Sequence, residues 1–279
     1  MKIIVPIKQV PETGNVKMDT ETGTIIRDGS ESIINPLDLY AIETAIELKE
    51  KHGGSVTAIS MGPPAAEKAL REAVAMGCDE AVLITDRKFA GSDTWATSYT
   101  LSAAIKKIGP FDFIVAGERA TDGDTGQVGP NLAAALNLPM ATFIRTIDVV
   151  KEASAIQVER LVEEGYEQLE LPLPALVTVV KEIAYPRLPT LRGKQRAKKM
   201  ELLRWGADDL DLDVTKIGLK GSPTRVVKIV SPRVTREGSR VEVKNEETLE
   251  KAVEELLTFL NERGFLAEHK RLTEGEKGA

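Results

Sequence analysis

The sequence contains very little cysteine and histidine. Cys78 is its single cysteine, and His52 and His269 are its two histidines. One cysteine excludes an internal disulfide, a cysteine-ligated iron–sulfur cluster and a cysteine-rich zinc site. Two histidines leave little for a histidine-rich metal site or for acid–base catalysis by histidine. We therefore expect no metal site and no catalytic side chain, so that any electrons this protein handles must sit on a bound organic cofactor.

Long apolar runs and excess positive charge are also missing. No apolar stretch approaches the roughly 20 residues that span a bilayer, so we expect a soluble chain that does not cross a membrane. The 37 Lys and Arg against 43 Asp and Glu give a formal net charge of −6, which argues against a general nucleic-acid binder. Residues 1–6 lack a signal-peptide pattern and are typical of a strand, so we expect a cytoplasmic protein.

The first half alternates apolar runs with amphipathic segments, as in an α/β fold whose mostly parallel sheet has helices on both faces. The predicted strands are residues 3–7, 55–61, 81–85 and 113–117. The predicted helices are residues 36–52, 65–76 and 93–108. Between the first strand and the first helix, short β-prone pieces around Gly23 predict an inserted β-hairpin over residues 16–26.

The pattern changes after a second β-rich block at residues 141–180. Residues 185–204 are basic and interrupted by prolines, residues 224–230 resemble a strand, and residues 246–261 form a strongly amphipathic helix. We therefore divide the chain into an α/β domain at 1–184, a basic loop and helix at 185–204, and a C-terminal extension at 205–279.

Residues 117–129 form the most informative loop, because they follow a predicted strand and open the helix that contains residues 132–136. Its glycines allow close backbone approach, and amides at a helix start favour an anion such as a phosphate. Asp122 and Asp124 would repel that anion if they faced it, so we expect them to bind ribose hydroxyls or backbone amides. A polar connection that caps a helix fits the local sequence equally well.

Residues 35–38 and 60–64 should meet that loop at the carboxyl edge of the sheet, where open α/β folds bind ligands. Each segment alone is typical of an ordinary cap or turn. Together, the three loops predict a nucleotide-shaped site. The GxGxxG and GxxxxGK[ST] motifs are both absent, which excludes the simplest dinucleotide-binding and P-loop interpretations.

Residues 85–97 leave the third strand and enter the next helix. Gly91 and the hydroxyls of Ser92, Thr94 and Thr97 predict a second nucleotide at that helix start. A capped helix with a buried Trp95 is the competing interpretation.

Residues 187–199 concentrate positive charge, with Leu188 and Leu191 as apolar protrusions. A solvated basic turn is the usual explanation of such a run. Apolar anchors within a basic rim also suit a docking loop for an acidic partner. Cys78, near a predicted helix end, is expected to be a small structural residue.

These segments, in this order, resemble the β-subunit family of electron transfer flavoproteins over nearly the whole chain. The resemblance rests on residues 5–11, 35–36, 60–63, 122–129, 158–160, 163–169, 174–178, 187–191 and 197–199. It implies a three-layer α/β/α sandwich that pairs with an α subunit and passes electrons between dehydrogenases through flavin. In these terms 1–184 is the nucleotide-binding domain, 185–204 is the partner-recognition loop and helix, and the extension at 205–279 packs on the main domain or on the α subunit. One group of the family holds a structural AMP in the β subunit, whereas the electron-bifurcating group holds a second FAD with NADH beside it.

Residues 86–97 and 121–125 look like the bifurcating group, which implies FAD and NADH as cofactors. The implied flavin or AMP site consists of Pro6, Lys8, Asn35, Met61, Asp122, Gly123, Asp124, Thr125, Gly126, Gln127 and Val128. The implied NADH site consists of Gly91, Asp93, Thr94 and Thr97. The implied partner-binding residues are Leu188, Leu191, Arg192 and Lys194, with Leu191 as the anchor for a dehydrogenase.

Three functions stay open at this point. The first is electron bifurcation, in which NADH electrons pass to ferredoxin or flavodoxin and, through the α subunit, to an acyl-CoA dehydrogenase or a quinone-linked oxidoreductase. The second is a non-bifurcating carrier subunit with AMP in the same site. The third is a nucleotide-binding α/β protein that acts without an α partner.

Overall fold

The structure, a computed structural model, describes residues 1–12, 17–18, 25–26, 32–150, 154–227 and 240–266. The chain divides into two compact units, Met1–Ile229 and Val230–Ala279. We describe each unit by itself.

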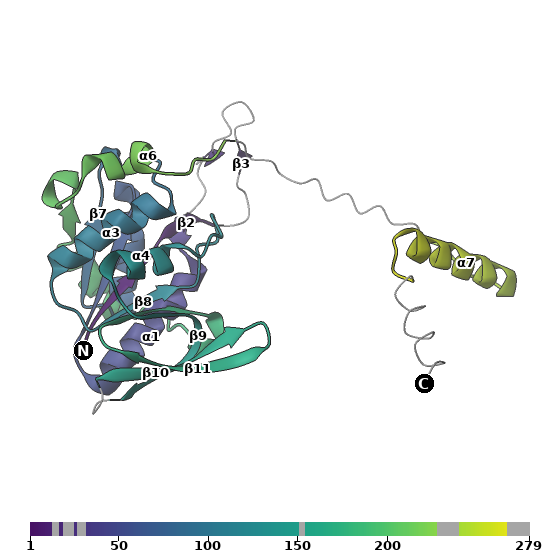
Figure 1. Ribbon diagram of the computed structural model, residues 1–279, viewed down its shortest axis with the longest axis horizontal. Helices are drawn as coiled ribbons and strands as arrows, with labels where there is room; N and C mark the ends of the chain where they lie inside the picture. The colour runs from purple at the N-terminus through teal and green to yellow at the C-terminus, as the bar shows by residue number, and fades with distance from the viewer. Residues whose placement is uncertain (13–16, 19–24, 27–31, 151–153, 228–239, 267–279) are drawn as a thin grey trace. The chain divides into compact units, whose positions relative to one another are not determined.

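A nine-stranded sheet forms the centre of the first unit (Figure 1). The strands in spatial order are β11 (Gly165–Pro172), β10 (Ala155–Val162), β9 (Met140–Val150), β12 (Ala175–Val179), β8 (Phe113–Gly117), β1 (Lys2–Pro6), β6 (Ser55–Met61), β7 (Glu80–Ile84) and β13 (Leu203–Trp205). In this spatial order, all neighbouring strands from β9 through to β13 at the far edge are parallel, whereas β10 is antiparallel to both β9 and β11.

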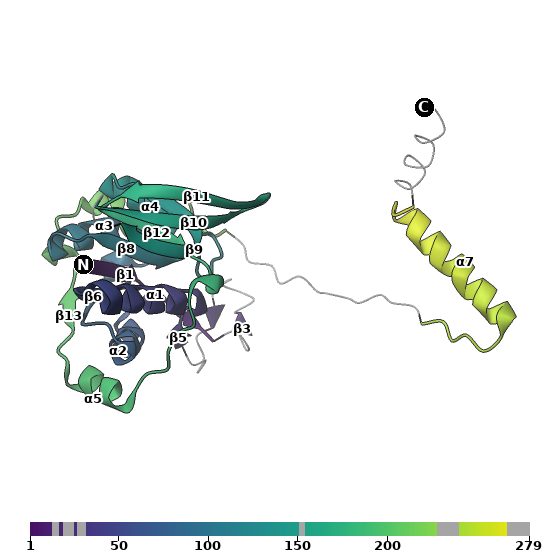
Figure 2. The same cartoon turned by 90° about the horizontal axis from the view of Figure 1, so that it is seen from below.

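Helices cover both faces of this sheet, which confirms the three-layer α/β/α fold (Figure 2). One face carries α1 (Pro36–His52), α2 (Glu67–Met76) and α5 (Leu191–Lys199), and the other carries α3 (Thr94–Ile108) and α4 (Val128–Leu136). Alternate strand residues feed the two cores, because successive side chains of a strand point to opposite faces. In β1, Ile3 and Val5 join the core under α1 and α2, and Ile4 joins the core under α3.

Short strands between β1 and α1 confirm the inserted hairpin in the residues that the structure describes. β3 (Lys17–Met18) pairs antiparallel with β4 (Ile25–Ile26), and the predicted turn residue Gly23 lies outside the described residues. Next to it, β2 (Gln9–Pro11) pairs antiparallel with β5 (Ser32–Ile34). These two small ladders separate the end of β1 from the start of α1.

The predicted strand at 224–230 is wrong in its described part, residues 224–227, which have no strand structure. The reason is local: the backbone N–H and the hydroxyl of Thr224 both donate to Oδ2 of Asp93, at 2.9 and 2.8 Å. That amide is therefore satisfied by a side chain rather than by a neighbouring strand. The edge strand of the sheet is β13 instead, and the short helix α6 (Gly218–Gly221) follows it.

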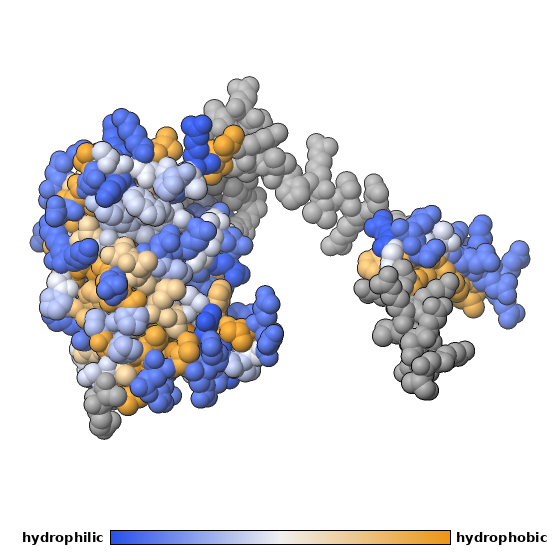
Figure 3. All heavy atoms as spheres, viewed as in Figure 1, coloured by the Kyte–Doolittle hydropathy of each residue, from blue (hydrophilic) through white to orange (hydrophobic). Residues whose placement is uncertain are grey.

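The second unit contains the predicted amphipathic helix, α7 (Glu246–Glu262). Asn245 caps it: its Oδ1 accepts from the backbone N–H of Thr248 at 2.9 Å, and the Thr248 hydroxyl accepts from the N–H of Asn245. Apolar side chains gather along the helix in Figure 3, and Leu249, Val253 and Leu256 are about half exposed. What these side chains pack against stays a prediction.

Candidate functional site

The strand order predicts a ligand crevice at the carboxyl ends of β1 and β8. From β1 the chain builds β6 and β7 on one side, then crosses back to place β8 and β12 on the other side. Open α/β sheets bind ligands at the carboxyl edge where the strand order reverses in this way. Pro6 ends β1, and Met61 ends the adjacent strand β6, so both predicted residues lie at this edge.

An ion pair joins two loops at this edge of the sheet. Nζ of Lys8, just after β1, lies 2.7 Å from Oδ1 of Asp122, in the loop that follows β8. The backbone N–H of Lys8 donates to Oδ2 of Asp38 in the first turn of α1, also at 2.7 Å. Two of the predicted site residues are thus brought together from positions 114 residues apart.

The Asn35 side chain forms hydrogen bonds with the backbone of the same loop. Asn35 occupies the N-cap position of α1 and is fully buried, but its side chain makes no cap hydrogen bond. Its Nδ2 donates to the carbonyl of Arg119 at 2.9 Å, and its Oδ1 accepts from the N–H of Thr121 at 3.1 Å. The predicted capping role is therefore wrong, and the Asn35 side chain instead fixes the path of the loop between β8 and α4.

Asp38 is a buried carboxyl next to this network, and sequence reasoning did not include it among the binding residues. Burial raises its pKa to about 7, against the opposing effect of hydrogen bonds from Lys8 and Asn35. The sequence signal for it is an acidic residue in the first turn of a helix that begins at the sheet edge. Sequence reasoning also omitted Arg119 from the site. The pattern that indicates it is a cation placed between the acidic residues Glu118 and Asp124.

The carboxylates of the loop face cations. Nε of Arg119 lies 2.6 Å from Oδ1 of Asp124, while Asp122 pairs with Lys8. Asp124 and Gly126 both adopt left-handed backbone conformations, with φ of 52° and 63°. Neither aspartate therefore presents an unpaired negative charge toward the start of α4.

Helix α4 has no side-chain cap at its N-terminus, and the loop before it has open space at Gly123. A β-carbon on Gly123 would meet nothing within 4 Å. Gly129, in the first turn, packs so closely on β12 that a β-carbon there would lie 2.5 Å from Cγ2 of Thr178. Pro130 has no N–H and the N–H of Asn131 bonds the carbonyl of Gln127, so Val128 and Gly129 supply the first-turn N–H groups of α4 that suit an anionic group.

The second predicted nucleotide segment adjoins the first. The hydroxyl of Thr94, at the start of α3, donates to Oε1 of Gln127 at 2.8 Å. Thr97 lies one turn further along α3 and is half-buried. The two predicted sets of nucleotide-binding residues therefore meet at this hydrogen bond.

Asp93 and Gly91 contact residues 219–224, which follow β13 in the chain. Asp93 caps α3 by accepting from the N–H of Ala96 at 3.0 Å, and its other oxygen accepts from Thr224. Burial raises the pKa of Asp93, but these hydrogen bonds outweigh burial and hold the pKa below its ordinary value. Gly91 has a φ of 76° and lies against Leu219.

Trp95 is not buried, which corrects the alternative that placed it in the core. Its side chain is 42% exposed and stacks on Tyr99, with ring centroids 5.8 Å apart. It projects from α3 because the neighbouring residue Ala96, rather than Trp95, faces the sheet.

The predicted docking residues lie on the surface near α5. Leu188 and Leu191 are 87% and 83% exposed, and Arg192 and Lys194 are exposed beside them. The hydroxyl of Thr190 caps α5 by accepting from the N–H of Gly193 at 2.9 Å. The exposed leucines Leu188 and Leu191 and the basic residues Arg192 and Lys194 thus lie on the same part of the surface.

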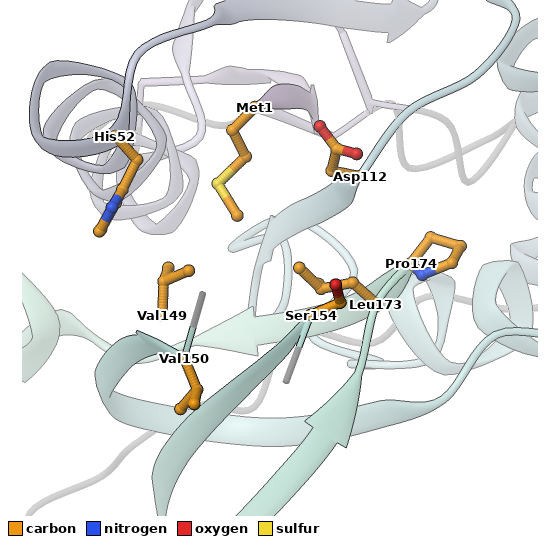
Figure 4. A pocket seen from close by; sticks show the side chains of 8 residues that line it. All are labelled: Met1, His52, Asp112, Val149, Val150, Ser154, Leu173 and Pro174. Carbon is orange, nitrogen blue, oxygen red and sulfur yellow. The ribbon is translucent and has the colours of Figure 1, made fainter. Parts of the chain in front are cut away.

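The opposite, amino-terminal edge of the sheet has a hollow of about 450 Å³. Figure 4 shows Met1 and His52 on one side of it and Val149 and Leu173 on the other. Asp112, also in its wall, accepts from the N–H of Lys2 at 2.7 Å and so serves the fold. The carboxyl edge is the stronger candidate because it gathers the polar groups.

Two other kinds of feature are absent from the described parts of the chain. No group of three or more His, Cys, Asp or Glu side chains there is arranged to hold a metal ion. None of the helices described is long and apolar enough to cross a membrane. Cys78 is fully buried, as expected of a structural residue.

Known proteins resemble this chain closely. Residues 22–210 match the family described as the electron transfer flavoprotein domain. The chain is 48% identical to electron transfer flavoprotein subunit beta of Thermoanaerobacterium thermosaccharolyticum, over 92% of this chain and 98% of that protein. It is 46% identical to caffeyl-CoA reductase-Etf complex subunit CarD of Acetobacterium woodii, over 83% and 88%. It is 42% identical to protein FixA of Sinorhizobium fredii, over 93% and 92%.

Proposed function

This chain belongs to the electron transfer flavoprotein family as a β subunit, and on that premise we propose that it is the NADH-binding half of a bifurcating heterodimer. In this role it binds FAD in the crevice between β1 and β8, and NADH at the start of α3. Electrons from NADH then leave by two routes, one to a low-potential and one to a high-potential acceptor.

The charged groups at the carboxyl edge support a dinucleotide site there. Lys8 pairs with Asp122, and Arg119 pairs with both Glu118 and Asp124, which reduces the negative charge that a phosphate would meet at the start of α4. Asn35 and Pro6 are buried and support the strand ends from inside the fold, whereas Met61 is partly exposed there. The proposed site is completed by Gly123, Thr125, Gly126, Gln127 and Val128. A bound flavin supplies both hydride acceptance and single-electron transfer. The residues of this chain bind and orient it.

One contact carries the choice of bifurcation over a structural AMP: the 2.8 Å hydrogen bond between Thr94 and Gln127. It joins the proposed NADH residues to the proposed flavin loop. A hydride donor must lie against its acceptor, so the two nucleotides need adjoining sites. The relative named as a subunit of a caffeyl-CoA reductase-Etf complex supports a redox assembly of this kind.

The nucleotide content of the purified heterodimer tests the proposal. We expect two FAD for each αβ pair and reduction of both by NADH. One FAD with one AMP would overturn bifurcation and favour the non-bifurcating carrier. A stable flavin-free homo-oligomer would instead favour a protein without an α partner.

Paired threonine variants test the NADH site. Thr94→Val removes the hydroxyl that bonds Gln127, and we expect slower flavin reduction by NADH with unchanged flavin content. The control is Thr100→Val on the same helix, whose hydroxyl bonds the carbonyl of Ala96 and faces the core. Equal NADH kinetics in both variants would remove Thr94 from the site.

The proposed partners follow from the same assignment. We place the heterodimer in the cytoplasm, with ferredoxin or flavodoxin as the low-potential acceptor and an acyl-CoA dehydrogenase or quinone-linked oxidoreductase as the high-potential one. Leu188, Leu191, Arg192 and Lys194 form the docking surface. Leu191→Ala should impair electron delivery to the dehydrogenase and leave flavin content intact. Loss of flavin would contradict the docking role.

A further inference from the structure

Arg187 fastens the proposed docking loop to α1. Its guanidinium donates to both oxygens of Glu43 at 2.8 to 3.0 Å and to both oxygens of Glu50 at 2.7 and 3.0 Å. Its backbone N–H also donates to Glu43, at 2.9 Å. The Glu43 side chain is only 4% exposed. Main chain and side chain of one residue are thus both tied to a buried carboxylate.

A second set of contacts fixes the other end of the loop. One terminal nitrogen of Arg196 in α5 donates to the carbonyls of Val74 and Cys78, at 2.6 and 2.7 Å. Gly193 lies so close to α2 that a β-carbon there would stand less than 3.0 Å from the carbonyl oxygen of Ala75. Helix α5 therefore rests directly on α2, and the loop is held on both sides.

Between these anchors, Leu188 and Leu191 project into solvent from a fixed backbone. A loop that is already ordered loses less entropy on binding, so more of the contact energy appears as affinity. We infer that Arg187 is a positioning residue, whose clamp on Glu43 and Glu50 pre-orders the loop so that Leu188 and Leu191 are presented to the acceptor dehydrogenase. This inference rests on the proposed docking role of the loop.

A purely structural role for Arg187 makes a different prediction. If the pair only neutralised the buried Glu43, replacing both partners with apolar residues would restore a normal protein, because paired replacement of buried ions is often neutral. If Arg187 positions the loop, the paired variant Glu43→Leu with Arg187→Met stays folded but leaves the loop loose. The paired variant therefore separates the two roles, even if Arg187→Gln alone is unstable.

Hydrogen exchange in the heterodimer measures the clamp directly. We expect the amides of residues 185–191 to exchange at least about tenfold faster in the paired variant, with α1 unchanged. Arg187→Lys should restore protection only in part, because one ammonium does not match two carboxylates. Arg145→Gln is the control, since it breaks another part-buried arginine–glutamate pair, Arg145–Glu159 at 2.5 Å, away from the loop. Unchanged exchange of residues 185–191 in the paired variant would overturn the inference.

Kinetics with a purified acyl-CoA dehydrogenase as acceptor measure the consequence. In the paired variant we expect KM for the dehydrogenase to rise about tenfold while kcat, flavin content and reduction of a small dye stay near wild type. A KM unchanged although exchange is faster would also overturn the positioning role. A separate result tests the proposed docking surface itself: if Leu191→Ala leaves KM for the dehydrogenase unchanged, the docking role is contradicted, whatever the Arg187 variants show.

Discussion

Gly117 lies against Asp38 so closely that a β-carbon on the glycine would stand less than 3.0 Å from Oδ1 of that carboxyl. The same β-carbon would also press on the backbone of Leu37. The end of β8 thus passes directly over the first turn of α1. This close approach lets the loop after β8 reach Lys8 and Asn35.

Gly117→Ala should therefore damage both stability and the nucleotide site. The added methyl meets backbone and a buried carboxyl that have no room to move, which typically costs about 1–3 kcal/mol. We expect a lower urea midpoint and reduced nucleotide content in the heterodimer. Gly123→Ala is the matched control for stability, because a β-carbon there meets open space. Equal urea midpoints for the two variants would contradict the packing described here.

Asp38 should make stability depend on pH in the opposite sense to an ordinary carboxylate. Its pKa is about 7 in the folded protein and about 3.8 in the unfolded chain, so the folded state holds the proton between those values. Stability should fall as pH rises from about 4 to 7, by at most about 4 kcal/mol for this group, and then level off.

Asp38→Asn tests this dependence, because the amide oxygen can still accept from the backbone of Lys8. We expect the variant to resemble wild type near pH 4 and to be more stable at pH 8. Urea unfolding of the complex at both pH values is the measurement. If the variant is less stable than wild type at pH 8, the folded protein favours the ionised carboxylate of Asp38 over the protonated one, and the prediction is wrong.

Sequence patterns predicted the central layers because those elements carry local signals. Buried parallel strands such as β6 and β8 are short apolar runs, and α1 is bounded by Asn35-Pro36 and Gly53-Gly54. The strand β13 has only three residues, and its pairing with β7 depends on a partner about 120 positions away. No local pattern specifies such a register.

The site was predictable as a set of converging loops but not as a set of contacts. Topology alone brings the segments of Lys8, Asn35 and Asp122 to one edge. Whether the Asn35 side chain caps its own helix or bonds the loop after β8 depends on which groups lie within reach. That choice is made by tertiary packing, and the side chain bonds Arg119 and Thr121.

Cys78 should be inert in the folded protein. It is fully buried, and burial raises the pKa of its thiol to about 12, so almost none is ionised at pH 8. We expect no alkylation by iodoacetamide of the native heterodimer at pH 8, and complete alkylation in denaturant. Peptide mass spectrometry of the segment around residue 78 provides the readout. Rapid native labelling would mean that the end of α2 opens readily.

The ion pair between Lys8 and Asp122 should matter for ligand binding more than for folding. The Lys8 side chain is 49% exposed and that of Asp122 is 24% exposed, and solvent-exposed pairs contribute at most about 1 kcal/mol to stability. Lys8→Gln should therefore leave the urea midpoint near wild type. It also leaves Asp122 without its cation beside the proposed phosphate position, so we expect weaker nucleotide retention, most clearly at low salt.

Lys88→Gln is the control, because Lys88 also forms a 2.7 Å pair, with Asp208, and is 47% exposed. Equal nucleotide content after gel filtration of both variants would exclude a binding role for Lys8.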